Sequence, residues 1–530
     1  MQSYKLTVDK FLDHAAKWFP AREVVEADSG RVVARAGYAE LRERSNRFSG
    51  ALAALGAKPG DRIATLAWNT RHHFEITYAA MGAGLVCHTL NPRLMPEQLA
   101  RMIAEAEDQL IAVSAMLLPL LEQVASFSPP FRHVIVLDEG PVPHSVGGAQ
   151  VWRYEELLLS RGRETAWGDF DEEAPAGLCY TSGTTGNPKG VVYTHRSNYL
   201  HTMRSLQADA MAISGSDVVL MAVPMFHANG WGVPFAAPAV GARLVLPGRH
   251  SDGASLAKLI RAEGVTVAVG VQTVWLGVVD HLRQSGGDLP TLKRLIIGGS
   301  NCPEALIRDI EEGLGVSVQT SWGMTELSPL GTISPPGAPR HSASGRPPIG
   351  LDLKLKDASG RTLEQQREQG GHLWVKGASV LDRYFRAPSD ALDEEGYFDT
   401  GDLAIIDFDG NLTIRGRSKD LIKSGGEWIN PAEIEAIVGQ DPSVSLVAVI
   451  STPNEKWGER PLLVVQPRNG KHVDNARLIS ALRGKVADWW IPQQVAQIAS
   501  MPLATSGKID KNRLRADFDA GELVAEDVGR

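Results

Sequence analysis

The 530-residue chain has few cysteines, no excess of basic residues and no long apolar run. Its three cysteines, Cys87, Cys179 and Cys302, are scattered without metal-ligand spacing. This pattern argues against a disulfide framework and favours a reducing compartment. The net charge of −8 leaves no basic field to attract nucleic acid, so we expect no nucleic-acid partner.

Signals for export or membrane insertion are also lacking. Residues 1–9 contain no apolar signal core, and the longest apolar stretch, near residues 110–121, is short and contains Pro119. We therefore expect no transmembrane segment and a cytoplasmic location. With 43% hydrophobic and 22% charged residues the composition is typical of a globular protein, and the length predicts more than one domain.

Alternating sequence patterns predict an α/β fold. Between residues 38 and 137, and again between 218 and 321, short apolar strands alternate with helix-periodic segments. Such alternation predicts parallel sheets with helices on both faces, and a ligand crevice at the carboxyl ends of the strands. The expected helices cover residues 41–55, 72–81, 96–106, 254–262 and 303–314.

The pattern changes in the last third of the chain. From residue 345 to 415 the apolar period shifts toward two, with turn signals between the strands, which predicts a small β-subdomain. A boundary near residues 416–420 is followed by a short α/β piece with helices from 431 and over 475–486. The predicted fold is a large N-terminal domain of two doubly wound sheets plus this β-subdomain, followed by a small α/β C-terminal domain.

One stretch, residues 180–196, concentrates glycine and hydroxyl residues between two strand-like segments. Consecutive N–H groups there can form an anion nest, hydroxyls donate to phosphate oxygens, and Lys189 adds a mobile charge. The stretch is not a Walker A loop, because Lys189 is followed by Gly190 and a strand. A plain polar turn is the alternative, but seven Gly, Ser or Thr among residues 180–190 favour a polyphosphate loop.

Three further motifs carry candidate chemistry. In Trp322-Gly-Met-Thr-Glu326, which follows a predicted strand, Trp322 could stack on a purine and Glu326 could hold a hard cation such as Mg²⁺. Asp402, in a predicted loop, could accept two ribose hydroxyls. Lys508 closes the motif Pro502-Leu-Ala-Thr-Ser-Gly-Lys508 near the C-terminus. Taken singly, these are equally a strand end with one acid, a turn carboxylate and a solvated lysine.

Together and in this order, the loop and the three motifs resemble those of the adenylate-forming superfamily, which holds acyl-CoA synthetases, peptide-synthetase adenylation domains and luciferases. Trp322 replaces the commoner Tyr, which preserves stacking but loses the hydroxyl. The resemblance covers nearly the whole chain. It implies an N-terminal domain at 1–416, a hinge at 417–421 with Lys419 as its pivot, and a mobile C-terminal lid domain at 422–530.

The resemblance implies a reaction in two halves that uses ATP, Mg²⁺ and coenzyme A. A carboxylate would first attack the α-phosphorus of ATP, with Lys508 binding both groups, His227 orienting the carboxylate, and Thr184 and Glu326 holding the metal. The implied catalytic residues are therefore Lys508, His227 and Glu326. The residues implied for ATP or AMP binding are Thr181, Ser182, Gly183, Thr184, Thr185, Lys189, Gly299, Ser300, Thr320, Ser321, Trp322, Gly323, Thr325, Asp402 and Arg417.

In the second half a thiol attacks the acyl-adenylate. Members of the superfamily rotate the C-terminal domain between the halves, which withdraws the lysine and opens a pantetheine tunnel. Small residues would line this tunnel, because only they leave room for the pantetheine arm. The residues implied for coenzyme A are Lys423, Ser424, Gly425, Gly426 and Trp428.

The acyl pocket carries the evidence on substrate. The segment from Met225 to Trp231 resembles a motif of medium- and long-chain fatty acyl-CoA synthetases and of 3-methylmercaptopropionyl-CoA ligases. Trp231 matches the position that gates the acyl tunnel, with ordinary core packing as the alternative. Gln272 stands where relatives usually have Pro, and we hypothesise that it admits a partly polar or ether-containing acid. The implied pocket residues are Trp231, Gly230, Gln272 and Gly298.

The expected function is activation of a carboxylic acid, a medium-chain fatty acid or a similar ether or thioether acid, to its CoA ester. Three alternatives remain: an aryl or 2-arylpropionate CoA ligase, an adenylation enzyme that loads a carrier protein, and a non-enzymatic binding protein. The glycines at 425 and 426 and Trp231 favour free coenzyme A, and the retained loop and lysine disfavour a non-enzymatic role. A homodimer is expected by analogy with fatty-acyl relatives.

Overall fold

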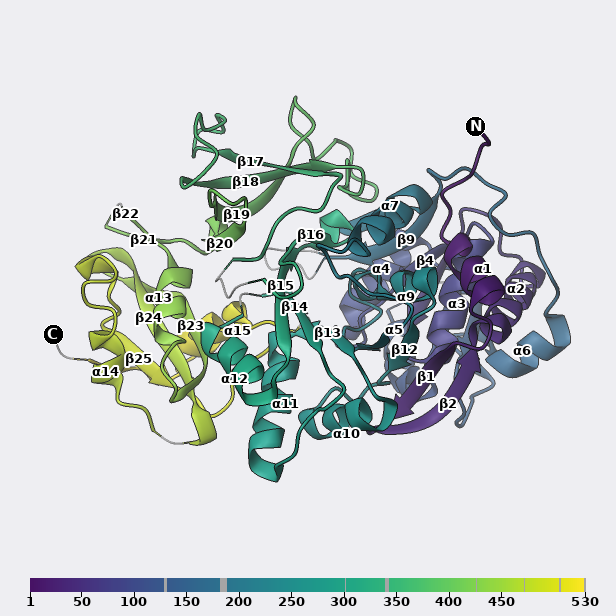
Figure 1. The fold of residues 1–530 in the computed structure, drawn as a ribbon, viewed down its shortest axis with the longest axis horizontal. Helices are drawn as coiled ribbons and strands as arrows, with labels where there is room; N and C mark the ends of the chain where they lie inside the picture. The colour runs from purple at the N-terminus through teal and green to yellow at the C-terminus, as the bar shows by residue number, and fades with distance from the viewer. Residues whose placement is uncertain are drawn as a thin grey trace.

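The computed structural model describes residues 1–127, 131–181, 188–300, 302–338, 343–425, 427–470, 472–504 and 507–528. It has a large body, formed by the first two-thirds of the chain, with the C-terminal part packed at one end (Figure 1). The β-subdomain lies beside both, at the top of that view. The predicted α/β class, with a large N-terminal and a small C-terminal domain, is confirmed.

The first large sheet has the strand order β10-β9-β4-β3-β5-β6-β8-β7. Its central pairs are parallel, and β7 and β10 add antiparallel edges. The strands are β3 (Arg62–Leu66), β4 (Val86–Thr89), β5 (Leu110–Val113), β6 (His133–Val136), β7 (Ser145–Val146), β8 (Ala149–Arg153), β9 (Pro175–Tyr180) and β10 (Gly190–Thr194).

The second large sheet has the order β16-β15-β14-β13-β11-β12-β1-β2 and is also parallel except at its edges. Two of its strands, β1 and β2, come from the N-terminal part of the chain. The sequence patterns did not predict the long-range pairing of β1 with β12. The strands are β1 (Glu23–Asp28), β2 (Arg31–Gly37), β11 (Val218–Met221), β12 (Arg243–Leu246), β13 (Val267–Val271), β14 (Arg294–Gly298), β15 (Ser317–Gly323) and β16 (Leu330–Ile333).

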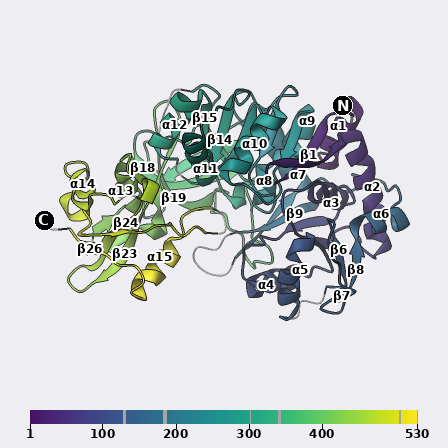
Figure 2. The ribbon, with the colours of Figure 1, turned by 90° about the horizontal axis from the view of Figure 1, so that it is seen from below.

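Helices cover both faces of the two sheets (Figures 1 and 2). Alternate residues of a strand face opposite cores: Val219 joins the core between the sheets, while Leu220 joins the core under α10, α11 and α12. The helices are α1 (Asp9–Trp18), α2 (Tyr38–Ala54), α3 (Arg71–Gly82), α4 (Pro96–Ala106), α5 (Leu118–Ala125), α6 (Tyr154–Arg161), α7 (His195–Ser205), α8 (Ala228–Trp231), α9 (Val233–Val240), α10 (Gly253–Glu263), α11 (Gln272–Ser285) and α12 (Glu304–Leu314), with 3₁₀ turns η1 (Ala115–Leu117) and η2 (Thr325–Leu327).

The β-subdomain is an antiparallel meander of β17 (Leu351–Lys356), β18 (Gly370–Gly377), β19 (Phe398–Ile406) and β20 (Leu412–Arg417). Asp402 was expected in a loop but lies within β19. Along β19, buried residues alternate with more exposed ones. This is the period of two that a half-buried strand requires. Its cross-strand partner is Arg417.

The C-terminal domain is a further α/β unit around a mixed sheet. The helix predicted over 475–486 ends at Ser480, and residues 481–486 instead form turns and a bridge between Arg483 and Val486, with Gly484 at a φ of +70°. The elements are η3 (Ser418–Asp420), β21 (Ile422–Ser424), β22 (Glu427–Ile429), α13 (Pro431–Val438), β23 (Val444–Asn454), β24 (Gly458–Pro467), η4 (Arg468–Gly470), α14 (Asn475–Ser480), η5 (Asp488–Trp490), β25 (Gln494–Gln497), α15 (Lys511–Asp519) and β26 (Glu526–Asp527).

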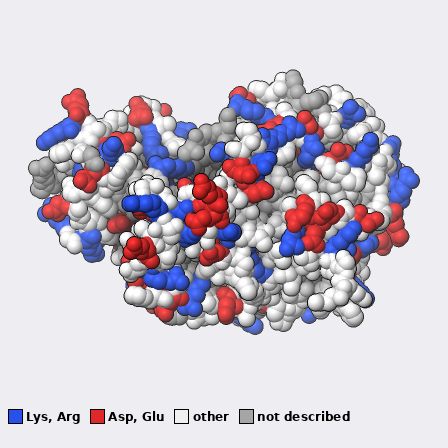
Figure 3. Space-filling view, turned by 90° about the horizontal axis from the view of Figure 1, so that it is seen from above, with Lys and Arg blue, Asp and Glu red and all other residues white. Residues whose placement is uncertain are grey.

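The surface and the helices agree with the composition. Among the described residues, no helix is both long and apolar enough to cross a membrane. On the face seen in Figure 3, acidic and basic side chains are intermixed, and neither sign forms a continuous field.

Candidate active site

The two strands β9 and β10 form a hairpin whose connection is the predicted phosphate loop. At its base the Thr181 N–H donates to the Lys189 carbonyl at 2.9 Å, and the Lys189 N–H donates to Thr181 Oγ1 at 3.2 Å. The predicted residues Ser182, Gly183, Thr184 and Thr185 lie outside the described residues. The structure therefore fixes the two ends of the loop. Thr181 follows the carboxyl end of β9, and Lys189 precedes the amino end of β10.

Lys189 and Glu326 lie close together, although 137 positions separate them in the sequence. The Lys189 ammonium sits over the Tyr384 ring, 4.7 Å from its centroid, and the Tyr384 hydroxyl donates to Glu326 Oε1 at 2.9 Å. The Tyr193 hydroxyl, on β10, donates to the Thr325 carbonyl at 2.8 Å. The loop end and the Thr325-Glu326 turn thus form one continuous polar edge.

Glu326 is the acid best placed for a metal. It lies in η2, is 8% exposed, and burial raises the pKa of its carboxyl above the usual value. Within the described part of the chain, no three His, Cys, Asp or Glu side chains cluster into a ligand set. A single carboxylate fits Mg²⁺ in nucleotide sites, since that ion keeps several waters and takes its remaining ligands from phosphates.

Trp322 and Arg417 hold the two oxygens of Asp402. The Trp322 indole N–H donates to Asp402 Oδ2 at 2.8 Å, and Arg417 Nε lies 2.9 Å from Oδ1. The Trp322 indole therefore supplies a hydrogen-bond donor of its own. The sequence alone indicates only that Trp322 lacks the hydroxyl of the commoner Tyr. Asp402 is 2% exposed, and burial raises its pKa while Arg417 opposes that rise.

Lys508 reaches this group of charges from the C-terminal domain. The turn that carries it is closed by a hydrogen bond from the Ala504 N–H to the Lys508 carbonyl at 2.6 Å. The Lys508 side chain opens onto a large cavity, whose walls are protein. This enclosure, followed by repulsion from Arg417, lowers the pKa of Lys508 to about 8, against opposing attraction from Asp402 and Glu326.

One cavity of about 600 Å³ lies beside Lys508. Of the residues singled out in the sequence, eight line it: His227, Trp231, Gly299, Ser321, Trp322, Gly323, Thr325 and Lys508. Its other walls include the polar residues Arg93, Tyr180 and Ser251 and the apolar residues Met211, Ala222, Val223, Pro224, Val271, Val274, Pro329 and Leu330. A lining that combines cationic and hydroxyl groups with many apolar side chains suits a ligand that carries a charged group on an apolar body.

The gate region around Trp231 has an unusual backbone. Residues 228–232 all have positive φ, including Ala228 at +38°, Asn229 at +47° and Trp231 at +56°. Non-glycine residues in this region are strained, and such strain concentrates at functional sites. The run comprises all of α8 together with Gly232, and the Trp231 ring lies at the end of β14, where a Cβ on Gly298 would clash with Ser321 Oγ and lie 3.0 Å from the ring. Any side chain at position 298 would therefore displace Ser321 or the Trp231 ring.

Other predicted residues lie elsewhere. Gln272 lines a small cleft between the two domains, not the large cavity, because the first turn of α11 directs it toward β23 and η4. The Thr320 hydroxyl donates to the Ala343 carbonyl at 2.7 Å, away from the cavity. Gly230 is buried in the left-handed run with its Cα next to Met221. Ser300, at the end of the β14 turn, does not line the cavity either.

The residues predicted for coenzyme A form a separate hairpin on the C-terminal domain. Lys423 and Trp428 face each other across β21 and β22, with the ammonium 5.6 Å from the ring centroid, and Trp428 is 52% exposed. Ser424 is buried and accepts from Arg460 at 3.3 Å. Gly426 lies outside the described residues. None of the described members of this set lines the large cavity.

Sequence reasoning missed part of the site. Tyr384 and Thr273, from the β-subdomain and α11, contact Glu326 and the Lys508 turn respectively. No motif marks Tyr384. Thr273 directly follows Gln272 in residues 269–275, a segment that resembles an acyl-pocket wall of the family, so a signal for Thr273 was present in the sequence.

The fold and the site define a class of two-domain α/β enzyme in which a lysine from the small domain enters a polar and apolar cavity of the large one. Residues 12–385 match the model of the AMP-binding enzyme family, and residues 433–508 match its AMP-binding enzyme C-terminal domain. The chain belongs to the AMP-binding enzyme family.

Similar proteins cover the whole length. The chain is 41% identical to a 3-methylmercaptopropionyl-CoA ligase of Ruegeria lacuscaerulensis, over 98% of each chain. It is 40% identical to a medium-chain-fatty-acid–CoA ligase of Ectopseudomonas oleovorans, over 98% of this chain and 97% of that one. The crystal structure of the anthranilate CoA ligase AuaEII with anthranoyl-AMP superposes with a TM-score of 0.87 at 22% identity, over 98% and 99% of the two chains, and shares the fold.

Proposed function

We propose that this protein is an AMP-forming acyl-CoA ligase, which activates a carboxylic acid with ATP and transfers the acyl group to coenzyme A. The observation that carries the proposal is the position of Lys508. It lines one cavity together with Trp322, Thr325, His227 and Trp231. One lysine can there face both a phosphate and a carboxylate.

In the first half-reaction the chain's own residues position and neutralise charge. Thr181, Lys189 and the loop between them receive the phosphates, and Asp402 and Arg417 lie where a ribose would be bound. His227 orients the carboxylate, and Lys508 stabilises the charge that builds as the carboxylate oxygen attacks the α-phosphorus and pyrophosphate leaves. Mg²⁺, held by Glu326, would supply additional charge neutralisation at the phosphates.

The second half-reaction requires Lys508 to leave. The coenzyme A residues Lys423, Ser424, Gly425 and Trp428 lie on the β21–β22 hairpin, outside the cavity. Rotation about residues 417–421, with Lys419 as the pivot, would exchange the Lys508 turn for this hairpin. The geometry seen here is then that of the acid-activating half, and domain rotation lets one cavity serve both halves.

The substrate class rests on the apolar part of the cavity lining and on two relatives. Many of the lining side chains are aliphatic or proline, and the relatives at 41% and 40% identity are named for 3-methylmercaptopropionate and medium-chain fatty acids. We propose a medium-chain fatty acid or a thioether acid of similar length. Two possibilities compete with this proposal. The substrate could be an aryl acid, or the acyl acceptor could be a carrier protein instead of coenzyme A.

Pyrophosphate release with a panel of acids tests the function. We expect release with ATP, Mg²⁺ and medium-chain or thioether acids, and conversion to the acyl-CoA only when coenzyme A is added. Preference for benzoate-type acids would favour the aryl ligase. Release without acyl-CoA formation, but with acylation of an added carrier protein, would favour the carrier-loading enzyme. No release with any acid would contradict the proposal.

The pKa of Lys508 predicts a pH dependence. The lysine acts when protonated, and its pKa is lowered from 10.5 to about 8. The kcat/KM for acyl-adenylate formation should therefore fall as the pH rises through about 8, because the free enzyme then loses the ammonium charge. Lys508→Arg should move this fall to higher pH at a reduced maximum. A flat profile up to pH 10 in the unmodified enzyme would contradict the role of the lysine.

Assembly and location complete the proposal. We expect a homodimer formed through the N-terminal domain, by analogy with fatty-acyl relatives, and a cytoplasmic enzyme, because the scattered cysteines favour a reducing compartment. One chain has a mass of 57.2 kDa. For a dimer, light scattering on the purified protein should give twice that mass.

A further inference from the structure

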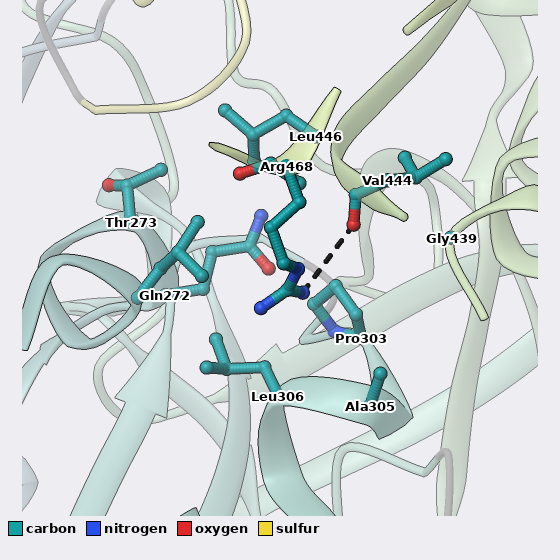
Figure 4. A pocket seen from close by; sticks show the side chains of 11 residues that line it. Gln272, Thr273, Pro303, Ala305, Leu306, Gly439, Val444, Leu446 and Arg468 are labelled. Carbon is teal, nitrogen blue, oxygen red and sulfur yellow. Dashed lines mark hydrogen bonds between the residues drawn. The ribbon is translucent and has the colours of Figure 1, made fainter. Parts of the chain in front are cut away.

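A small cleft lies where the C-terminal domain meets the N-terminal domain (Figure 4). It is distinct from the large cavity and has a volume of about 20 Å³. One wall comes from α11 and the start of α12, the other from the region after α13, from β23 and from η4. The cleft therefore exists only while the two domains are docked in the present orientation.

Arg468 of η4 spans this cleft. Its Nη1 lies 3.9 Å from Asp280 Oδ1 on α11 and 3.8 Å from Asp309 Oδ2 on α12, and its Nη2 donates to the Val444 carbonyl at 3.4 Å. The Arg468 side chain is 17% exposed, and those of Asp280 and Asp309 are 34% and 26% exposed. The guanidinium is thus anchored in its own domain and shared between two carboxylates of the other.

Asp280 and Asp309 do not depend on Arg468 alone. Arg283, on the same helix as Asp280, lies 2.6 Å from Asp309 and 3.8 Å from Asp280. When the C-terminal domain moves away, the two acids keep Arg283 as a partner. Undocking therefore breaks one pair of contacts without leaving buried, unpaired carboxylates, which keeps the docked state reversible.

Gln272 contributes the second feature of the cleft. Its buried Oε1 and the buried Nε–H of Arg468 have no partner within the described residues, and Figure 4 shows the Gln272 amide turned toward the guanidinium. A space of this size holds about one water molecule, which would accept from Arg468 and donate to Gln272. Gln272 thus faces the domain interface, so any influence on acid polarity would be indirect.

The neighbouring residue connects the cleft to the chemistry. Thr273 Oγ1 donates to the Gly507 carbonyl at 3.3 Å, directly before Lys508 in the chain. Helix α11 therefore contacts the C-terminal domain at two points, through Asp280 at Arg468 and through Thr273 at the lysine turn. Any tilt of the domain about the Arg468 contact would shift the lysine relative to the cavity.

We infer that Arg468 is a positioning residue, which with Asp280 and Asp309 holds the C-terminal domain in the orientation that delivers Lys508 for acid activation. This inference rests on the proposed function. It assigns to the ion pairs a role in the first half-reaction only, since they must break before the domain can rotate for thioester formation.

The test is Arg468→Met, which keeps the length of the side chain and removes its charge. Acyl-adenylate formation should fall about tenfold, the effect of losing one charged contact, while thioester formation from supplied acyl-adenylate stays within about twofold of the unmodified enzyme. Asp280→Asn combined with Asp309→Asn should reproduce the effect, and adding Arg468→Met to that pair should cost little more.

Controls separate this role from general damage. Arg477→Met removes an ion pair with Asp441 inside the C-terminal domain, at 2.8 Å, and should leave both half-reactions unchanged. Arg468→Lys should restore most of the first half-reaction. Equal losses in both half-reactions for Arg468→Met, or no loss in either, would overturn the inference. An unmodified enzyme that forms no acyl-adenylate would instead overturn the proposed function.

Discussion

Lys508→Ala should reduce acyl-adenylate formation by about 10²–10³-fold or more. The ammonium is the cation that the C-terminal domain brings to the cavity, and the carboxylates of Asp402 and Glu326 attract it electrostatically. Removing it leaves the charge on the attacking oxygen and the α-phosphate without its nearest mobile counter-charge. The measurement is pyrophosphate release with a medium-chain acid and ATP at saturation.

The same variant should keep thioester formation from supplied acyl-adenylate, because that half-reaction proceeds after the lysine has withdrawn. Lys511→Ala is the matched control: Lys511 lies on the same segment but pairs with Glu435 at 2.7 Å inside its own domain. It should be active in both halves. Equal impairment of both halves in Lys508→Ala would contradict the assigned role.

Glu326→Gln should have the second-largest effect, a loss of at least about 100-fold in acyl-adenylate formation, since removal of a metal's charged ligand costs several kcal/mol. The change keeps the size of the side chain and an oxygen that can still accept from Tyr384. What it removes is the negative charge beside Lys189 that would hold Mg²⁺ at the phosphates. The dependence of the rate on Mg²⁺ concentration should shift to higher values.

A Mg²⁺ titration distinguishes this explanation from a packing defect. Partial recovery of the rate at high Mg²⁺ supports a metal ligand. A lowered rate with an unchanged Mg²⁺ dependence would count against it. Glu97→Gln, which removes a surface ion pair with Arg101 on α4, should leave both the rate and the Mg²⁺ dependence as they are in the unmodified enzyme.

Local patterns predicted much of the fold. The helix expected over residues 96–106 matches α4, and the strand expected over 351–356 matches β17, because their apolar periods of 3.6 and 2 are unambiguous and turn residues bound them. The helix predicted to 486 ended at Ser480, and the residues after it form turns that include the left-handed Gly484, which the apolar pattern did not reveal. The pairing of β1 with β12 has no local signal, because strand partners are chosen by long-range packing.

The site divides in the same way. The chain order alone identified Lys189, Glu326, Asp402 and Lys508 as chemical groups, because their residue types and spacing limit what they can bind. It also placed Gln272 at the acyl pocket, whereas the folded chain turns that side chain to the domain interface. Thr273, the residue next to Gln272, lines the large cavity. No sequence period specifies which of two neighbouring residues faces the cavity.

What the sequence by itself determined is the set of groups to which we assign the chemistry: a loop proposed for phosphates, one acid proposed for a metal, one acid for a sugar and one lysine for a carboxylate. These follow from the identity of side chains and survive any rigid rearrangement of the domains. Only the tertiary structure decided which of them meet. Lys508 reaches Asp402 and Glu326 because Arg468, Asp280, Asp309 and Thr273 dock two separately folded domains, and contacts between distant surfaces depend on shape and charge in three dimensions.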